Sequence, residues 1–124
     1  MKIQKIHKKY SLFEKAKKYY TILFILNDLP ISFKEIDLVA FCAIKGTIST
    51  PPVRDEFVKL FHSSKNTVYN MSAKLQKQGI FIKTQNKIKI NPVILLDFSE
   101  ELFLAIKLSN DINGTLKEEN STTA

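Results

Sequence analysis

The chain has 124 residues, of which 44% are hydrophobic and 25% charged, and its formal net charge is +7. This length fits one domain, and this hydrophobic share suffices for a packed core, so we do not expect general disorder. No apolar stretch approaches the roughly 20 residues that a membrane span needs, and the Lys-rich start lacks the apolar region of a secretion signal. We therefore expect a soluble cytoplasmic protein. The single cysteine, Cys42, has no partner for a disulfide.

The charge is distributed unevenly along the chain. Residues 1–20 hold seven Lys and one Glu, and residues 57–96 hold seven Lys and no carboxylate. The segments 21–56 and 97–124 carry a net negative charge. Polyanions respond to such local clusters and not to the total charge. The acid-free segment 57–96 is therefore the first candidate for a nucleic-acid contact.

Two amphipathic helices are predicted in the first part of the chain. Apolar residues recur at helical spacing from Leu12 to Leu26, and an Asn-Asp-Leu-Pro segment ends this helix. The second helix begins with a capping box formed by Ser32 and Glu35, and its apolar face continues to Gly46, where a left-handed C-cap is easiest.

Two further helices are predicted to meet across a tight turn. Two adjacent prolines can open a helix but cannot lie inside one, which predicts a third helix from about Pro52 to Phe61. Ser64 is a good N-cap for a fourth helix over residues 65–78, which Gly79 ends.

A short β-hairpin and a last helix follow. Residues 80–84 and 87–90 predict two strands joined by a Gln-Asn turn, and the second strand alternates strictly between Lys and Ile. We name residues 80–90 the wing. Ser99 and the two acids after it predict a helix from Ser99 to about Leu108.

These elements predict a mainly α fold with a small β-hairpin, in the order α-α-α-α-β-β-α. The predicted domain covers residues 12–108. A basic leader over residues 1–11 precedes it, and a flexible polar and acidic tail over residues 109–124 follows it, because the tail has few apolar groups.

From Glu56 the chain reads EFVKLFHSSKNTVYNMSAKLQKQGI. This segment resembles the helix-turn-helix of winged-helix transcription regulators of the MarR-like and GntR-like types. His62 stands where that pattern usually has glycine, and Ser63 stands where it is usually apolar. The resemblance implies a winged helix-turn-helix fold that binds double-stranded DNA. The matching residues are Glu56, Lys59, Leu60, Ser64, Thr67, Val68, Leu75, Gly79 and Ile80.

The candidate DNA contacts lie on the fourth helix and on the wing. Asn can pair with adenine, Thr can contact a thymine methyl group, and Lys can reach guanine or phosphate. Lysines on a wing can contact the DNA backbone or the minor groove. The candidates on the fourth helix and its cap are Ser64, Lys65, Asn66, Thr67, Tyr69, Asn70 and Lys74. The candidates on the wing are Lys83, Asn86, Lys87 and Lys89.

We expect no enzymatic activity, cofactor or metal site. His7 and His62 lack a local carboxylate or cysteine pattern, and the three glycines are too far apart for a phosphate-binding loop.

The leading hypothesis is a sequence-specific transcriptional regulator that forms a homodimer through its first and last helices. The alternative is an adaptor that uses the same fold to bind a protein, for example in viral assembly or beside a polymerase, because a fold does not fix a function. The abundance of Lys, Ile and Asn suggests an AT-rich genome, which would suit a phage or a mobile element. A Lys-bearing helix or an amphipathic hairpin is by itself typical of any solvated surface; their adjacency and the helix-turn-helix spacing favour DNA.

Overall fold

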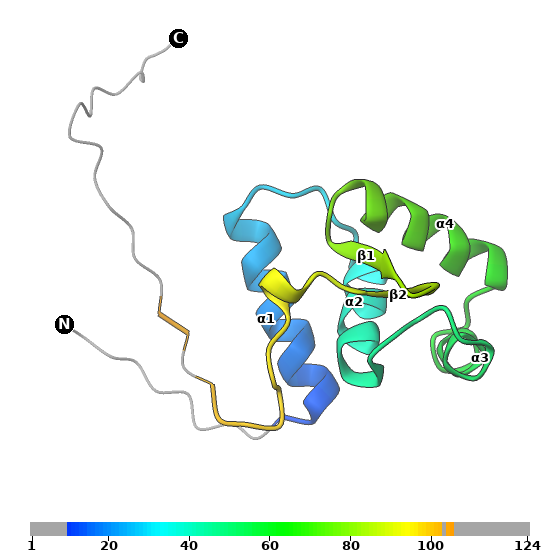
Figure 1. The fold of residues 1–124 in the computed structure, drawn as a ribbon. Helices are drawn as coiled ribbons and strands as arrows, with labels where there is room; N and C mark the ends of the chain where they lie inside the picture. The colour runs from blue at the N-terminus through cyan, green and yellow to red at the C-terminus, as the bar shows by residue number, and fades with distance from the viewer. Residues whose placement is uncertain (1–9, 103, 106–124) are drawn as a thin grey trace, which may run out of the picture.

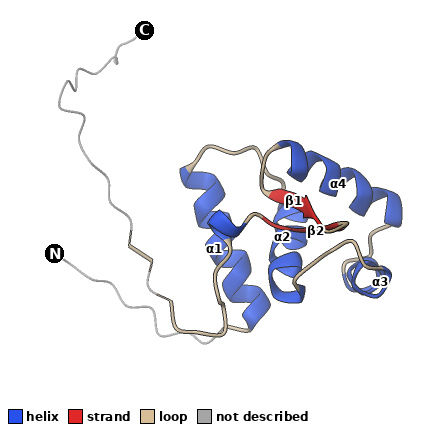
Figure 2. Ribbon diagram, viewed as in Figure 1, coloured by secondary structure: helices blue, strands red, loops and turns tan. Residues whose placement is uncertain are grey.

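The computed structural model describes residues 10–102, 104 and 105. In this part of the chain, four α-helices precede a two-stranded antiparallel hairpin and a short 3-10 turn (Figures 1 and 2). The elements are α1 (Leu12–Leu26), α2 (Phe33–Lys45), α3 (Pro51–Leu60), α4 (Lys65–Lys77), β1 (Phe81–Thr84), β2 (Lys87–Ile90) and η1 (Pro92–Ile94). The four predicted helices and the hairpin are confirmed.

The ends of α1 and α2 follow from local hydrogen bonds. Ser32 and Glu35 form the predicted capping box of α2, and Gly46 adopts the predicted left-handed conformation, with φ 90°. An equivalent box, which the sequence analysis did not identify, starts α1, where Ser11 and Glu14 cap each other's backbone N–H groups. Each box satisfies two backbone donors that a helix start otherwise leaves unpaired.

The core lies where α1 packs against α2 and where the hairpin covers α2 and α4. Its largest fully buried side chains include Tyr20 and Phe24 of α1, Phe57 of α3 and Phe81 of β1. Burial of an aromatic side chain contributes about 2–3 kcal/mol relative to exposure, so these residues fix how the helices pack. Tyr20 and Phe24 of α1 are therefore part of the core.

The loop between α2 and α3 anchors the wing. The Ile48 N–H donates to the Ile88 carbonyl at 3.2 Å, and the Thr47 hydroxyl donates to the same oxygen at 2.8 Å. The Ile88 N–H in turn donates to the Ser49 hydroxyl at 3.1 Å. The hairpin is therefore held to the helical core by backbone atoms as well as by its apolar face.

After the hairpin, the chain returns along α1. We name residues 91–102 the return segment. The Tyr20 hydroxyl donates to the Ile94 carbonyl at 2.9 Å, and the Lys15 ammonium donates to the Glu100 carbonyl at 2.8 Å. Phe98 is buried, with its ring 5.8 Å from that of Tyr20.

The predicted last helix, from Ser99 to about Leu108, is wrong for the residues that are described. Residues 99–102, 104 and 105 are not helical, and residues 103 and 106–108 lie outside the described part of the chain. The Ser99 N–H and hydroxyl both bond to Asp97, so this serine closes a turn instead of capping a helix. Phe98, which precedes this serine, packs against Tyr19 and Tyr20 of α1.

The described fold is mainly α with a β-hairpin, in a winged-helix-like arrangement. The hairpin lies in front of α2 in Figure 1, and α4 runs across the top. None of the described helices is long and apolar enough to cross a membrane. The predicted tail over residues 109–124 and all but the last two residues of the predicted leader lie outside the described residues.

Candidate nucleic-acid interface

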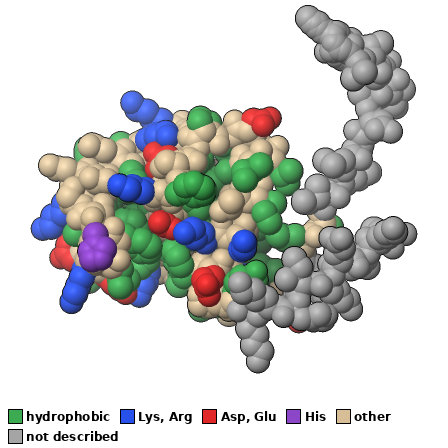
Figure 3. Space-filling view, turned by 180° about the vertical axis from the view of Figure 1, so that it is seen from behind, with side chains coloured by type: hydrophobic (Ala, Val, Ile, Leu, Met, Phe, Trp, Pro, Cys, Tyr) green, Lys and Arg blue, Asp and Glu red, His purple; other side chains and the backbone are tan. Residues whose placement is uncertain are grey.

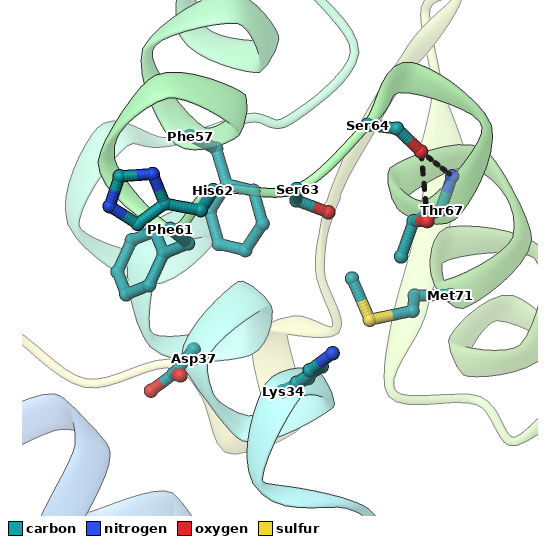
Figure 4. Close-up of a pocket in the computed structure, with 9 residues that line it drawn as sticks. All are labelled: Lys34, Asp37, Phe57, Phe61, His62, Ser63, Ser64, Thr67 and Met71. Atoms are coloured by element: carbon teal, nitrogen blue, oxygen red, sulfur yellow. Dashed lines mark hydrogen bonds between the residues drawn. The ribbon is translucent and has the colours of Figure 1, made fainter.

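The turn between α3 and α4 depends on a left-handed histidine. His62 has φ 50°, the conformation for which the compared helix-turn-helix pattern usually has glycine. The Ser63 N–H donates to the Val58 carbonyl at 3.0 Å and closes the turn. The Ser64 hydroxyl then accepts from the Thr67 N–H at 3.1 Å, so Ser64 caps α4 as predicted (Figure 4). Because that hydroxyl accepts a hydrogen bond from the backbone of α4, the role of Ser64 in this structure is to cap the helix.

The outer face of α4 is exposed and carries neutral polar and basic groups. Lys65, Asn66 and Asn70 are exposed, and Tyr69 is 74% exposed. Val68, Ser72 and Leu75 are the buried residues of the opposite face. Thr67 differs from the other candidates because it is half-buried at the edge of this helix.

Lys77 belongs to the same outer face, although the sequence analysis did not select it. It is exposed and follows Asn70 by seven residues, which are two helical turns. That spacing was the signal that could have identified it.

Lys74 is the candidate whose surroundings differ most from the prediction. Its ammonium donates to the Glu35 Oε1 at 2.9 Å and to the Pro30 carbonyl at 3.1 Å. The side chain is 45% exposed, but its charge is paired with a carboxylate that is only 8% exposed. Lys74 therefore joins α4 to the start of α2, and this ammonium is not a free cation for DNA.

The electrostatics of Glu35 reflect this junction. Burial by itself raises the pKa of the Glu35 carboxyl, but the hydrogen bonds from Ser32 and the ammonium of Lys74 outweigh it and hold the pKa below its ordinary value. The carboxylate is thus ionised at neutral pH and needs both partners.

The register of the hairpin divides the wing lysines between its two faces. Directly paired residues of antiparallel strands share a face. Lys87 and Lys89 lie on one face, whereas Lys83 pairs with Ile88 and lies on the other. Lys83 and Lys87 are exposed and Lys89 is half-buried. Asn86 is exposed at the tip and has φ 62°.

Two carboxylates of the neighbouring helices α2 and α3 have cationic partners. Glu35 pairs with Lys74, and Glu56 lies 3.1 Å from Lys45. Residues 57–96 contain no acid, so no carboxylate of α4 or of the wing itself offsets the exposed lysines of these two elements. On the face seen from behind in Figure 3, Lys and Arg side chains lie among hydrophobic ones, and Asp and Glu side chains are also present.

The described residues include metal-ligating side chain types and one buried thiol. No group of three or more His, Cys, Asp or Glu there could hold a metal ion. Burial raises the pKa of the Cys42 thiol to about 12, against a weaker opposing hydrogen bond with Ile90, so this cysteine is protonated at neutral pH. A protonated, buried thiol is a poor nucleophile.

Comparisons with protein-family models, with curated proteins and with solved structures found no match to this chain.

Proposed function

We propose that this chain is a sequence-specific double-stranded DNA-binding protein that regulates transcription and has no catalytic activity. In this proposal α4 enters the major groove, and the wing contacts the backbone or the minor groove. The observation that carries it is the exposed outer face of α4, which offers Asn66, Tyr69 and Asn70 between lysines with no carboxylate among them. The likeness of the helix-turn-helix to MarR-like and GntR-like regulators supports the same function.

The dimensions of the parts support this mode of binding. An α-helix with its side chains is roughly 10–12 Å across, and the major groove is roughly 12 Å wide. Asn66 and Asn70 are one helical turn apart, so both amides can face neighbouring base pairs. Lys65, at the start of α4, and Lys87, near the tip of the wing, would neutralise phosphates on the flanking backbone.

The test is fluorescence anisotropy with random duplex DNA over a series of salt concentrations. We compare the wild-type chain with the double variant Lys65→Glu/Lys87→Glu. The proposal expects affinity that falls steeply with salt and a double variant that no longer binds. No binding of the wild type at low salt, or unchanged binding by the variant, would contradict it.

We propose further that two copies bind together through α1, because paired half-sites multiply contacts and specificity. The partner surface includes Leu12, Ile25 and Leu26, which α1 leaves exposed. Sedimentation with and without duplex DNA tests this, and a monomer at the highest concentrations in both cases would contradict it.

A second candidate function is that of a protein-binding adaptor. One observation favours it: a mostly apolar groove of about 320 Å³ lies between the start of α1 and the ends of α2 and α3. Leu60 at its edge is 59% exposed. If duplex DNA does not bind, this groove becomes the leading site, and Leu60→Glu should then abolish binding of an apolar dye to the folded chain. The groove-lining residues are Phe13, Phe41, Ile44, Lys45, Leu60 and Phe61.

A further inference from the structure

The start of α2 lies against one edge of α4. The contacts of Lys74 with the Pro30 carbonyl and with Glu35 join the two helices at that edge. Thr67 precedes Lys74 by seven residues and lies on the same edge. Exposed residues of the first turn of α2 therefore border the outer face of α4.

A hollow of about 400 Å³ opens along this edge, between the first turn of α2 and the turn before α4. Lys34 lines it from α2, opposite Ser64 and Thr67 (Figure 4). Lys34 is exposed, and the hydroxyls of Ser64 and Thr67 lie 2.9 Å apart across the hollow from it.

The charges around the hollow favour an anion. Asp37 also lines it, but its Oδ1 lies 2.9 Å from the ammonium of Lys17, which compensates its charge. Glu35 is compensated by Lys74. His62 lines the far end of the hollow and is exposed.

A helix that fills the major groove brings both of its edges close to a phosphate backbone, because helix and groove have similar widths. The wing follows α4 through Gly79 and packs against it in front of α2 (Figure 1). The start of α2 borders the other edge. We infer that Lys34 contacts a backbone phosphate of duplex DNA at the hollow, on the side of α4 away from the wing. This inference rests on the proposed function and adds a contact from a third element.

The test compares Lys34→Gln with the wild type and with Lys18→Gln, by anisotropy on random duplex DNA over a salt series. Lys18 is a matched control, since it is exposed on α1 and its replacement changes the net charge equally. The logarithm of affinity falls with the logarithm of salt by about 0.9 per neutralised phosphate. Lys34→Gln should therefore reduce the slope of log affinity against log salt by about 1 and should weaken binding alike on all sequences. Lys34→Arg should restore both the slope and the affinity.

Two results would overturn the inference, and they are distinguishable. If the wild type binds duplex DNA and Lys34→Gln behaves like Lys18→Gln, the contact at the hollow is absent and the proposed function stands. If the wild type does not bind at low salt, the proposed function fails and the inference fails with it. Circular dichroism of each variant establishes that an altered slope does not arise from unfolding.

Discussion

At the scale of single residues, the carboxylate of Glu35 stabilises two different parts of the structure. It caps the start of α2 through Ser32 and binds the ammonium of Lys74 on α4. Because the carboxylate is buried, removing either partner leaves part of its charge uncompensated. The orientation of α4 thus depends on a residue that lies outside the segment from α3 to α4.

This arrangement predicts a pH-dependent effect of Glu35→Gln. We expect the variant to lose about 1–2 kcal/mol of unfolding free energy at pH 7. The pKa of Glu35 is lowered by folding, so its stabilisation is complete above the ordinary value of 4.5 and is lost as the pH falls through the lowered folded-state pKa. Urea unfolding at several pH values measures the difference between wild type and variant. A difference that stays constant down to the lowest pH would refute this account.

Under the proposed function, two other residues should affect DNA binding in different ways. Asn70→Ala removes a base-reading amide and should cost about 1–3 kcal/mol on a selected binding site but little on random DNA. Lys87→Ala removes a phosphate contact and should weaken both duplexes alike and reduce the salt slope by about 1. Binding titrations on both duplexes check the contrast. Equal losses on the two duplexes for both variants would contradict this division of roles.

At the scale of elements, the wing depends on its two-residue turn. Gln85 and Asn86 have φ of 52° and 62°, which is the pattern of a type I′ turn. Asn86→Gly should preserve the hairpin, since glycine adopts this conformation without strain. Asn86→Pro should disrupt it, because proline fixes φ near −65°. We expect Asn86→Pro to lose roughly tenfold in DNA affinity, which is about 1.4 kcal/mol.

Thermal unfolding and anisotropy together check the prediction for the wing. The Asn86→Pro variant should keep a cooperative transition, because the helical core does not include the hairpin tip. Full DNA affinity in a variant whose hairpin is lost by NMR would show that the wing does not contact DNA.

The elements were predictable to the extent that their signals were local. The helices and the hairpin follow from spacing, caps and turn residues that lie close together in the sequence. The return segment was not predictable in this way, because Ser99 and the acids after it resemble a helix start. Its conformation is decided by Phe98 and Glu100, which contact α1 more than 70 residues earlier in the chain.

In the candidate site too, some features follow from local sequence patterns and others depend on contacts between distant residues. The exposure of Asn66 and Asn70 follows from helical periodicity, but the capture of Lys74 by Glu35 joins residues 39 positions apart. No local sequence pattern predicts that pair. Glu35 is already explained by the capping box with Ser32, so nothing near it in the sequence indicates a second partner. The face of the hairpin on which Lys83 lies could be predicted from the sequence, because a two-residue turn fixes which residues of the two strands are paired.

At the scale of the whole molecule, the buried thiol reports on cooperative unfolding. Cys42 is fully buried, and its pKa is raised to about 12. We expect it to react with an aromatic disulfide reagent only when the core opens, so its rate should rise steeply near the urea midpoint. The absorbance of the released thiolate measures this rate. Equal rates in native buffer and in urea would mean that the core around α2 is already open.

The contact between Lys15 and Glu100 brings the late part of the described chain back to the first turns of α1. In Figure 1, α1 lies on the opposite side of the molecule from α3. Two copies joined by a flexible linker from residue 102 of one copy to residue 10 of the next would therefore be tethered near the start of α1, with the outer face of α4 left accessible in both. Binding of the first copy would place the second at a high effective concentration, set by linker length, and would raise avidity without any new contact.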